Sequence, residues 1–495
     1  MTVTDNQPVP LGVRIGELAA ARGNQLAVTC AGVTRSWAEL DRRTNLMARG
    51  LQRHGAQLGS YVTIALPNSV EFIEACIACW KVGAVPQPVS SRLPAIELHA
   101  IVELADPAVV VTAGDVAMER QSVSIGDVLD GVDDDSALPA VISPSWKAPT
   151  SGGSTGRPKL IVSGYPGVVG ELSASVWRHR EDGVALMPGP LYHNGPFTSA
   201  FQGLMQGSSL VLMERFDAEE TLRLIDRHHV TWVYLVPAMM GRIWRLPTEV
   251  RESYDVSSLE VVWHLAAPCP EWLKQAWIDW VGAEKIWELY AGTEAQAGTV
   301  INGVEWLQHR GSVGRVSYGE MVILDDDGNP LPPGEVGEVF LKRGEGMPPS
   351  YRYVGAEARR RGEWESLGDV GWMDADGYLY LADRHSDMIL VGGSNVYPAE
   401  VEAALDEHPH VRSSAVIGLP DDDLGQVVHA IVQADPEQLD LDDLRRHLSE
   451  RLVRYKHPRT FELVDEPLRD DAGKIRRSAL RAERLARQEA SGGGS

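Results

Sequence analysis

The sequence is poor in cysteine, and the few that occur do not form a framework. Cys30, Cys76, Cys79 and Cys269 are too scattered for the disulfides of a small secreted domain. Cys76 and Cys79 form a C-x-x-C pair, but they lie in "EFIEACIACWKVGA", whose apolar residues recur at helical spacing. Because no second pair of ligands accompanies them, we expect two buried helix positions rather than a metal or redox site.

Long apolar runs and positive charge are also lacking. No stretch approaches ~18 uncharged apolar residues, and the opening segment lacks the basic start and apolar core of a leader. These absences predict a cytoplasmic protein without integral membrane association. The formal net charge of −23 argues against nucleic acid or an anionic membrane as the main partner. An acidic protein can still hold an anionic nucleotide in a local pocket.

The remaining composition is that of a globular α/β protein. Apolar runs at 61–66, 108–112, 209–213 and 231–236 alternate with amphipathic stretches such as 38–55 and 218–229, a pattern that predicts βαβ units and largely parallel sheets. Residues 321–343 predict two antiparallel strands joined by Asp-Gly-Asn-Pro and Pro-Pro-Gly turns, as a small β element. We therefore predict a large N-terminal domain over 1–383, a small mobile α+β domain over 384–490, and a linker or tag remnant at 491–495.

The stretch "TSGGSTGRPK", residues 150–159, has the composition of a phosphate-binding loop. Its three glycines let backbone N–H groups turn toward one point, and its hydroxyl side chains add donors. The P-loop of nucleotide triphosphatases is excluded, because Gly156 is followed by Arg157 and Pro158 instead of Lys and Ser or Thr.

The order of these residues resembles the phosphate-binding signature of the adenylate-forming superfamily, which comprises acyl-CoA synthetases, peptide-synthetase adenylation domains and luciferases. Gly153 is an extra glycine, and Leu160 stands where the family usually has Gly. The resemblance is greatest to bacterial acyl-CoA ligases of the fatty-acid or bile-acid type. It continues in order through "PLYHNGPF" (190–197), "LAAPC" (265–269), "YAGTE" (290–294), "GEVGEV" (334–339), "GDVGWMDADGYLYLADR" (368–384), "GGSNVYPAEVE" (392–402) and "DDAGKIRR" (470–477).

This resemblance implies an ATP site. Thr293 would contact the phosphate, Glu294 would hold Mg²⁺, and Asp369 with Arg384 would take the ribose hydroxyls. Mg²⁺ uses only one or two protein carboxylates, so a single Glu294 suffices. The implied ATP-binding residues are Thr150, Ser151, Gly152, Gly153, Ser154, Thr155, Gly156, Lys159, Ala266, Ala267, Tyr290, Ala291, Gly292, Asp369 and Arg384, with Ala291 replacing the family's glycine.

Lysine is the second scarce residue. Only eight of the 46 basic residues are lysine, so the one in "GKI" is less easily read as ordinary surface charge. A compact ammonium on a flexible stem can reach between a carboxylate and an α-phosphate, and the resemblance implies this catalytic role for Lys474. His193 is implied to gate the acyl pocket rather than to transfer protons.

The predicted substrate is a hydrophobic carboxylic acid. No Asp or Glu occurs between Asp182 and Glu214, so the ammonium of an α-amino acid would stay unpaired. Small residues leave room for a bulky or long acyl group, and the predicted pocket consists of His193, Gly195, Gly203, Ala297 and Gly298.

The acceptor implied by the resemblance is coenzyme A. Gly392 and Gly393 would let its pantetheine arm pass, and Ser386 would be the hinge, where the family usually has Asp or Lys. The prediction is thus an acyl-CoA synthetase that uses ATP, Mg²⁺ and CoA. The alternative acceptor is the phosphopantetheine of a carrier protein, and a homodimer is a further expectation.

Overall fold

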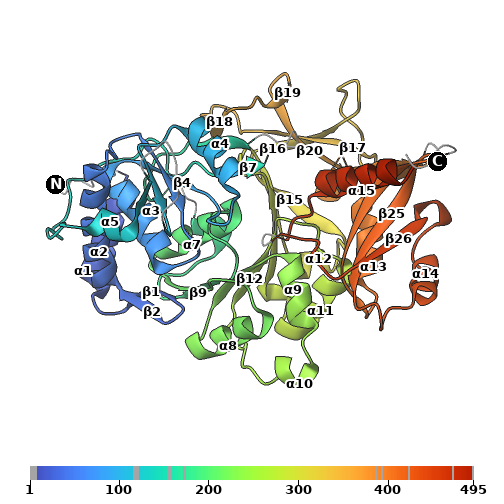
Figure 1. Cartoon of the computed structure of the whole chain (residues 1–495), viewed down its shortest axis with the longest axis horizontal. Coiled ribbons are helices and arrows are strands. Elements are labelled where there is room, and N and C mark those ends of the chain that lie inside the picture. Colours follow the sequence, from blue (N-terminus) through green and yellow to red (C-terminus); the bar gives the residue numbers. More distant parts are fainter. Residues whose placement is uncertain are drawn as a thin grey trace.

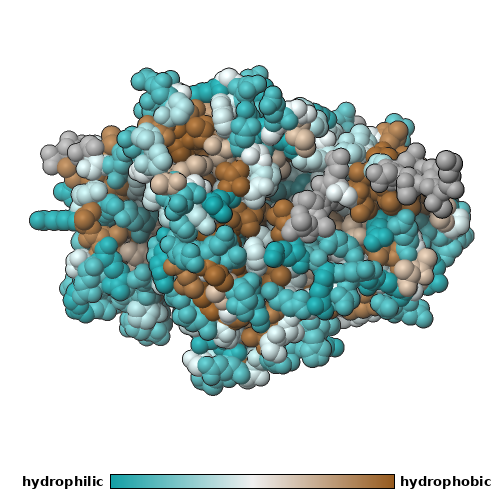
Figure 2. Space-filling view, turned by 180° about the vertical axis from the view of Figure 1, so that it is seen from behind, coloured by the Kyte–Doolittle hydropathy of each residue, from teal (hydrophilic) through white to brown (hydrophobic). Residues whose placement is uncertain are grey.

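The computed structural model describes residues 8–114, 122–152, 158–170, 174–384, 387–391, 394–421, 424–470 and 473–492. A large body contains the N-terminal three quarters of the chain, and a smaller part, orange to red in Figure 1, lies at one end of it. The face seen in Figure 2 is mostly hydrophilic, with scattered apolar patches, as the high net charge leads one to expect.

A 14-stranded sheet forms the centre of the large body. One half is parallel, and its strands are, in spatial order, β1 (Leu26–Cys30), β10 (Ser209–Leu212), β9 (Val184–Met187), β11 (Trp232–Leu235), β12 (Val261–His264) and β13 (Ile286–Ala291). β2 (Val33–Ser36) pairs with β1 in antiparallel orientation. The predicted parallel arrangement of the 209–213 and 231–236 runs is therefore confirmed.

The other half of this sheet is antiparallel. It continues from β13 through β14 (Gly298–Asn302), β15 (Ser312–Tyr318), β21 (Tyr378–Arg384), β20 (Trp364–Met373), β17 (Gly337–Lys342) and β16 (Glu320–Leu324), and β19 (Arg359–Arg361) pairs with β20. The antiparallel pair predicted for 321–343 forms as β16 and β17. β17 also pairs with β20, so this small antiparallel element extends the large sheet.

Two smaller sheets complete the large body. The first is parallel and contains β4 (Val85–Pro88), β3 (Tyr61–Ala65), β5 (Val109–Thr112) and β6 (Ser122–Ser124). The second is antiparallel and contains β18 (Tyr351–Val354), β8 (Pro158–Ser163) and β7 (Thr150–Gly152). Because β7 and β8 flank the predicted phosphate loop, this sheet fixes both of its ends.

The helices of the large body follow the amphipathic pattern of the sequence. Ser36 and Glu39 form a capping box that starts the helix over the predicted 38–55 segment. Cys76 and Cys79 are fully buried in a helix, as predicted. The helices are α1 (Leu11–Arg22), α2 (Trp37–Arg53), α3 (Val70–Val82), α4 (Ala95–Ala105), α5 (Ile125–Leu129), α6 (Ala174–Trp177), α7 (Asn194–Gln206), α8 (Ala218–His228), α9 (Pro237–Trp244), α10 (Thr248–Arg251), α11 (Glu271–Val281) and α12 (Gly303–Trp306).

The C-terminal part has its own sheet and core. Its strands are β23 (Ser394–Val396), β22 (Ile389–Val391), β25 (Gly425–Ala434), β24 (Val411–Asp421) and β26 (Thr460–Val464), and its helices are α13 (Pro398–Asp406), α14 (Leu441–Ser449) and α15 (Arg477–Gly492). The helix α15 thus continues into the segment predicted as a linker. Within the residues described, no helix is long and apolar enough to span a bilayer.

Arg245 forms a hydrogen-bonded contact between the large body and the C-terminal part. Arg245, at the end of α9, donates to the backbone oxygen of Asp406 at 2.8 Å and to that of Arg412 at 3.3 Å. Burial lowers the pKa of the Arg245 guanidinium, and the nearby Asp406 carboxylate counteracts this effect.

Buried histidines make the stability of the large body dependent on pH. The His179 ring stacks on Trp232 with 4.2 Å between ring centroids, and burial lowers its pKa from 6.5 to about 3. Below pH 6.5 the unfolded state therefore binds a proton that the folded state does not, and stability falls as the pH decreases toward 3.

We predict that the free energy of unfolding decreases by about 2 kcal/mol less in His179→Leu than in wild type when the pH is lowered from 7.5 to 5. One pKa unit corresponds to about 1.4 kcal/mol. Denaturant unfolding at the two pH values measures the effect, with His99→Gln as an exposed control. An equal loss of stability in wild type and His179→Leu would contradict the prediction.

Candidate active site

A cleft of about 2850 Å³ lies between the large body and the C-terminal part. Segments far apart in the sequence form its walls: β7 and β8, the first turns of α7, the segments that follow β12 and β13, and the loop between β26 and α15. The carboxyl ends of parallel strands in an open α/β sheet are a common place for ligand sites.

One acidic group of the cleft is Glu294, on the segment that follows β13. Its side chain is nearly buried, Tyr353 donates a hydrogen bond to Oε1 at 2.5 Å, and Lys159 Nζ lies 3.6 Å from the same oxygen. Lys159 Nζ also lies 3.9 Å from the centroid of the Tyr353 ring. Burial and the Glu294 charge raise the pKa of Tyr353, so its hydroxyl remains a donor at neutral pH.

The surroundings of Glu294 fit a hard divalent cation. A Cβ on Gly292 would come within 2.8 Å of Glu294 Oε2 and within 2.5 Å of Leu367 Cδ1, so the glycine keeps the space beside the carboxylate open. Carboxylate oxygens are suitable ligands for Mg²⁺, which needs few of them from the protein. Glu294 is therefore a suitable residue to hold Mg²⁺ together with phosphate oxygens.

A second polar group joins β13 to β20. The Tyr290 hydroxyl donates to Asp369 Oδ2 at 2.7 Å, and Asp369 is the cross-strand partner of Arg384. Two alanines of the cleft have left-handed backbones, with φ of +77° at Ala266 and +52° at Ala295. Such conformations are uncommon for non-glycine residues and cluster at functional sites.

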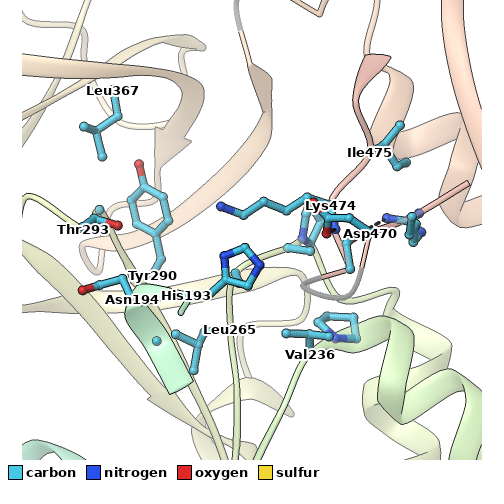
Figure 3. Close-up of a pocket in the computed structure, with 18 of the residues that line it drawn as sticks. His193, Asn194, Val236, Leu265, Tyr290, Thr293, Leu367, Asp470, Lys474 and Ile475 are labelled. Carbon is cyan, nitrogen blue, oxygen red and sulfur yellow. Dashed lines mark hydrogen bonds between the residues drawn. The ribbon is translucent and has the colours of Figure 1, made fainter. Parts of the chain in front are cut away.

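Lys474 reaches the cleft from the C-terminal part. In Figure 3 its side chain extends above His193 toward Tyr290. Gly473, with φ of +75°, brings this loop against the large body, because a Cβ there would lie 3.1 Å from Val236 Cγ2. Arg469 donates to the Gly473 oxygen at 3.2 Å and lies 3.7 Å from Glu402 of α13, so the loop is anchored to its own domain.

His193 is the N-cap residue of α7. Its Nε2 atom is buried and has no hydrogen-bond partner among the residues that the structure describes. Burial and the Lys474 charge lower the pKa of His193 to about 4, and the Asp470 carboxylate acts in the opposite direction. The ring is neutral at neutral pH, which suits a wall of the pocket better than a proton donor.

Most of the predicted site residues that the structure describes meet in this cleft. The residues at its wall are Thr150, Lys159, His193, Gly195, Ala266, Ala267, Tyr290, Ala291, Gly292, Thr293, Glu294, Asp369 and Lys474. Only the backbone of Ser151, Gly152 and Arg384 is described, and Gly153, Ser154, Thr155, Gly156, Ser386, Gly392 and Gly393 lie outside the described residues.

Three predicted pocket residues are not at the cleft wall. A Cβ on Gly203 would lie 3.0 Å from the His179 ring, and one on Gly298 would lie 2.6 Å from the Tyr318 ring. Ala297 is fully buried and packs against Gly319. In this structure these small residues permit close packing between elements.

Sequence reasoning missed several polar side chains of the cleft. Lys147, Gln202 and Tyr234 are at least nine-tenths buried and line it, and Tyr353 holds Glu294. The scarcity of lysine was a signal for Lys147, and the four-residue intervals between Asn194, Thr198 and Gln202 were a signal for Gln202. No sequence pattern indicates Tyr353, which comes from β18.

Comparison with known proteins assigns the chain to a family. The family described as AMP-binding enzyme matches residues 16–351, and the AMP-binding enzyme C-terminal domain matches residues 400–474. The chain belongs to the AMP-binding enzyme family, and the resemblance to adenylate-forming enzymes is confirmed.

Individual relatives of the chain are named as CoA synthases or CoA ligases. The chain is 33% identical over 477 residues to a feruloyl-CoA synthase from Amycolatopsis, covering 92% of this chain and 95% of the relative. It is 31% identical over 481 residues to a long-chain-fatty-acid–CoA ligase from Mycobacterium tuberculosis, covering 91% and 93%. The predicted class of acyl-CoA synthetase is thereby confirmed.

A solved structure has the same fold. The O-succinylbenzoate coenzyme A synthetase from Bacillus subtilis, in complex with ATP and a magnesium ion, superposes with a TM-score of 0.79 at 26% identity. The match covers 96% of this chain and 99% of that one. The predicted mixed α/β fold with a smaller C-terminal domain is confirmed.

The contact between Gly195 and Tyr234 generates a packing prediction. A Cβ on Gly195 would lie 2.4 Å from the Tyr234 hydroxyl oxygen. We expect Gly195→Ala to lower the free energy of unfolding by about 1–3 kcal/mol, the usual cost of overpacking. Addition of Tyr234→Phe removes that oxygen and should restore part of the loss. Denaturation of both single variants and the double variant measures the coupling, and strictly additive effects would contradict the contact.

Proposed function

We propose that this protein activates a hydrophobic carboxylic acid with ATP and Mg²⁺ as an acyl-adenylate and then transfers the acyl group to coenzyme A. The observation that carries the proposal is Lys474, which extends into a cleft whose opposite wall contains Glu294 and the Tyr290–Asp369 pair. The two domains thus bring a cation to the place where two anionic substrates would meet.

In the first step a carboxylate oxygen attacks the α-phosphorus of ATP, and the bond to pyrophosphate breaks. Both reactants are anionic, so donors and cations must stabilise the charge that builds on the α-phosphate. Lys474 neutralises this charge, and Thr293 donates a hydrogen bond to the phosphate. Glu294 would hold Mg²⁺, which would further neutralise the charge of the phosphate oxygens.

The nucleotide is held at the two ends of the cleft. Asp369, with Tyr290 as its hydrogen-bond donor at 2.7 Å, accepts hydrogen bonds from the ribose hydroxyls, and Arg384 helps to hold them. Lys159 and the 150–156 loop bind the terminal phosphates. Lys159 is already 3.6 Å from Glu294, an arrangement that supports a shared role of the two side chains at the phosphates and the metal.

In the second step the CoA thiol attacks the acyl carbonyl, and AMP leaves. Gly392 and Gly393 remain the predicted passage for pantetheine, and Ser386 remains the predicted hinge. The division into domains at 383 and 384 is part of this proposal, since a lid must present Lys474 for one step and withdraw it for the other. A homodimer stays a prediction.

The acyl substrate has an apolar body. Aromatic and aliphatic side chains of the cleft support this, among them Trp146, Ile161, Trp177 and Met239. Each buried CH₂ group would contribute about 0.8 kcal/mol of binding free energy until the pocket is full. The assay is the acid-dependent release of pyrophosphate across fatty, aromatic and polycyclic acids, followed by CoA-dependent formation of a thioester. Preferential activation of an α-amino acid would contradict the proposal.

Lys474→Ala separates the half-reactions. The rate of adenylation should fall by ~10²-fold or more in this variant, the range for removal of one preorganised electrostatic group. It should retain thioester formation from synthetic acyl-AMP and CoA, because that step has no attack on the α-phosphate. Pyrophosphate exchange and thioester formation, measured separately, give the two rates.

Lys456→Ala is the matched control, because Lys456 belongs to the same domain and pairs with Glu400 at 2.5 Å. It should leave both half-reactions near the wild-type rate. Equal loss of both steps in Lys474→Ala would assign Lys474 a role in folding and contradict the proposed chemistry. If AMP release requires a phosphopantetheinyl carrier protein instead of CoA, the acceptor is the carrier protein and not CoA.

A further inference from the structure

Lys147 is a buried cation in the wall of the cleft. Its side chain is 6% exposed, and its Nζ atom donates to Thr198 Oγ1 at 2.5 Å and to Asn194 Oδ1. The ammonium lies 4.2 Å from the centroid of the Trp146 ring. No carboxylate among the described residues forms an ion pair with it, although buried charges are normally paired.

The partners of Lys147 belong to a row of polar side chains on α7. Asn194, Thr198 and Gln202 follow at intervals of four residues, so they lie on one side of the helix with about 6 Å of rise between neighbours. All three line the cleft. We call Lys147, Asn194, Thr198 and Gln202 the polar wall.

Two members of the polar wall have unused donors. An ammonium has three N–H donors and no acceptor, and Lys147 uses two donors in the contacts with Asn194 and Thr198. Gln202 is 4% exposed, and no described residue hydrogen-bonds its side-chain amide. A purely hydrocarbon acyl group would cover both residues without a partner, at a cost of about 1–3 kcal/mol for each unsatisfied group.

The polar wall runs away from the reacting end of the cleft. Asn194 lies beside His193 and Thr293 in Figure 3, below the Lys474 side chain. Thr198 and Gln202 follow one and two turns further along α7. The reacting carboxylate has its cation in Lys474, so Lys147 and Gln202 are available to another part of the substrate.

We propose that Lys147 and Gln202 recognise a second oxygen on the acyl substrate. The preferred acid would then have an apolar body with a hydrogen-bond-accepting oxygen, as hydroxyl, carbonyl or carboxylate, at a distance from the carboxylate that reacts. This inference rests on the proposed function for the identity of the pocket, and it refines the substrate class. Hydrogen bonds to a charged donor contribute about 1.5–3 kcal/mol, enough for discrimination of at least ~10-fold.

Burial also lowers the pKa of Lys147 to about 7. A bound carboxylate would favour the charged ammonium, whereas a hydroxyl or carbonyl would accept from either form. The pH dependence of binding therefore separates the sources of the oxygen: affinity for a diacid decreases as the pH rises through about 7, and affinity for a neutral oxygen changes less.

The experiment measures equilibrium binding of matched acids by titration calorimetry, with pyrophosphate release as a second readout. The probes are a saturated straight-chain acid and a phenylpropanoid acid, each with its hydroxy, oxo and second-carboxylate counterparts. Wild type should bind at least one oxygenated member ~10-fold or more tightly than its plain parent. In Lys147→Met this ratio should fall to near one, while the plain acid binds as well as to wild type or better.

Gln202→Met is the second variant, because it keeps the length of the side chain and leaves Lys147 in place. It should lower the same ratio, while the plain acid binds as well as to wild type or better. Equal affinity of wild type for plain and oxygenated acids would overturn the inference. The inference would also be overturned if Lys147→Met weakened the binding of all acids to the same extent and Gln202→Met left the ratio unchanged. Lys147 would then bind the carboxylate that all the acids share, or it would stabilise the fold. Discrimination in binding without pyrophosphate release would leave the inference standing and contradict the proposed function instead.

Discussion

Electrostatic repulsion between a carboxylate and a triphosphate is the constraint on which the structure of this site depends. The protein carries a formal net charge of −23 and has only eight lysines, so cations cannot be supplied by a generally basic surface. Three of the eight, Lys147, Lys159 and Lys474, lie in one cleft. Local placement of scarce cations lets an acidic chain bind anionic substrates, because buried charges act over short distances with little screening.

Each of the three lysines depends on a different part of the fold. Lys159 is set by β8 and by contact with Tyr353 and Glu294. Lys147 is held by α7 and a tryptophan ring. Lys474 depends on the C-terminal domain, whose buried Glu402 binds Arg477 at 2.7 Å beside the Lys474 loop. Two lysines therefore belong to a fixed wall, and the third moves with any displacement of its domain.

The sequence predicted the alternation of strands and helices and the loops that carry the nucleotide motifs. These features are local: apolar periodicity and turn residues determine them, and the motifs keep their order along the chain. The sequence does not predict features that depend on contacts between residues far apart in the chain. Gly203 and Gly298 were predicted to line the acyl pocket, and the sequence could not indicate that a Cβ at these positions would meet the rings of His179 and Tyr318. The contact of Lys147 with α7 arises only from packing, and so does the union of β16 and β17 with the large sheet.

Transfer of oxygen from the acid to the nucleotide tests the central claim most directly. The acid, labelled with ¹⁸O in both carboxylate oxygens, is incubated with the protein, ATP, Mg²⁺ and CoA, and the products are analysed by mass spectrometry. Attack of the carboxylate on the α-phosphate predicts one ¹⁸O atom in AMP, none in pyrophosphate, and one in the thioester. Label in inorganic phosphate with ADP as the nucleotide product, or AMP without label, would contradict the acyl-adenylate mechanism.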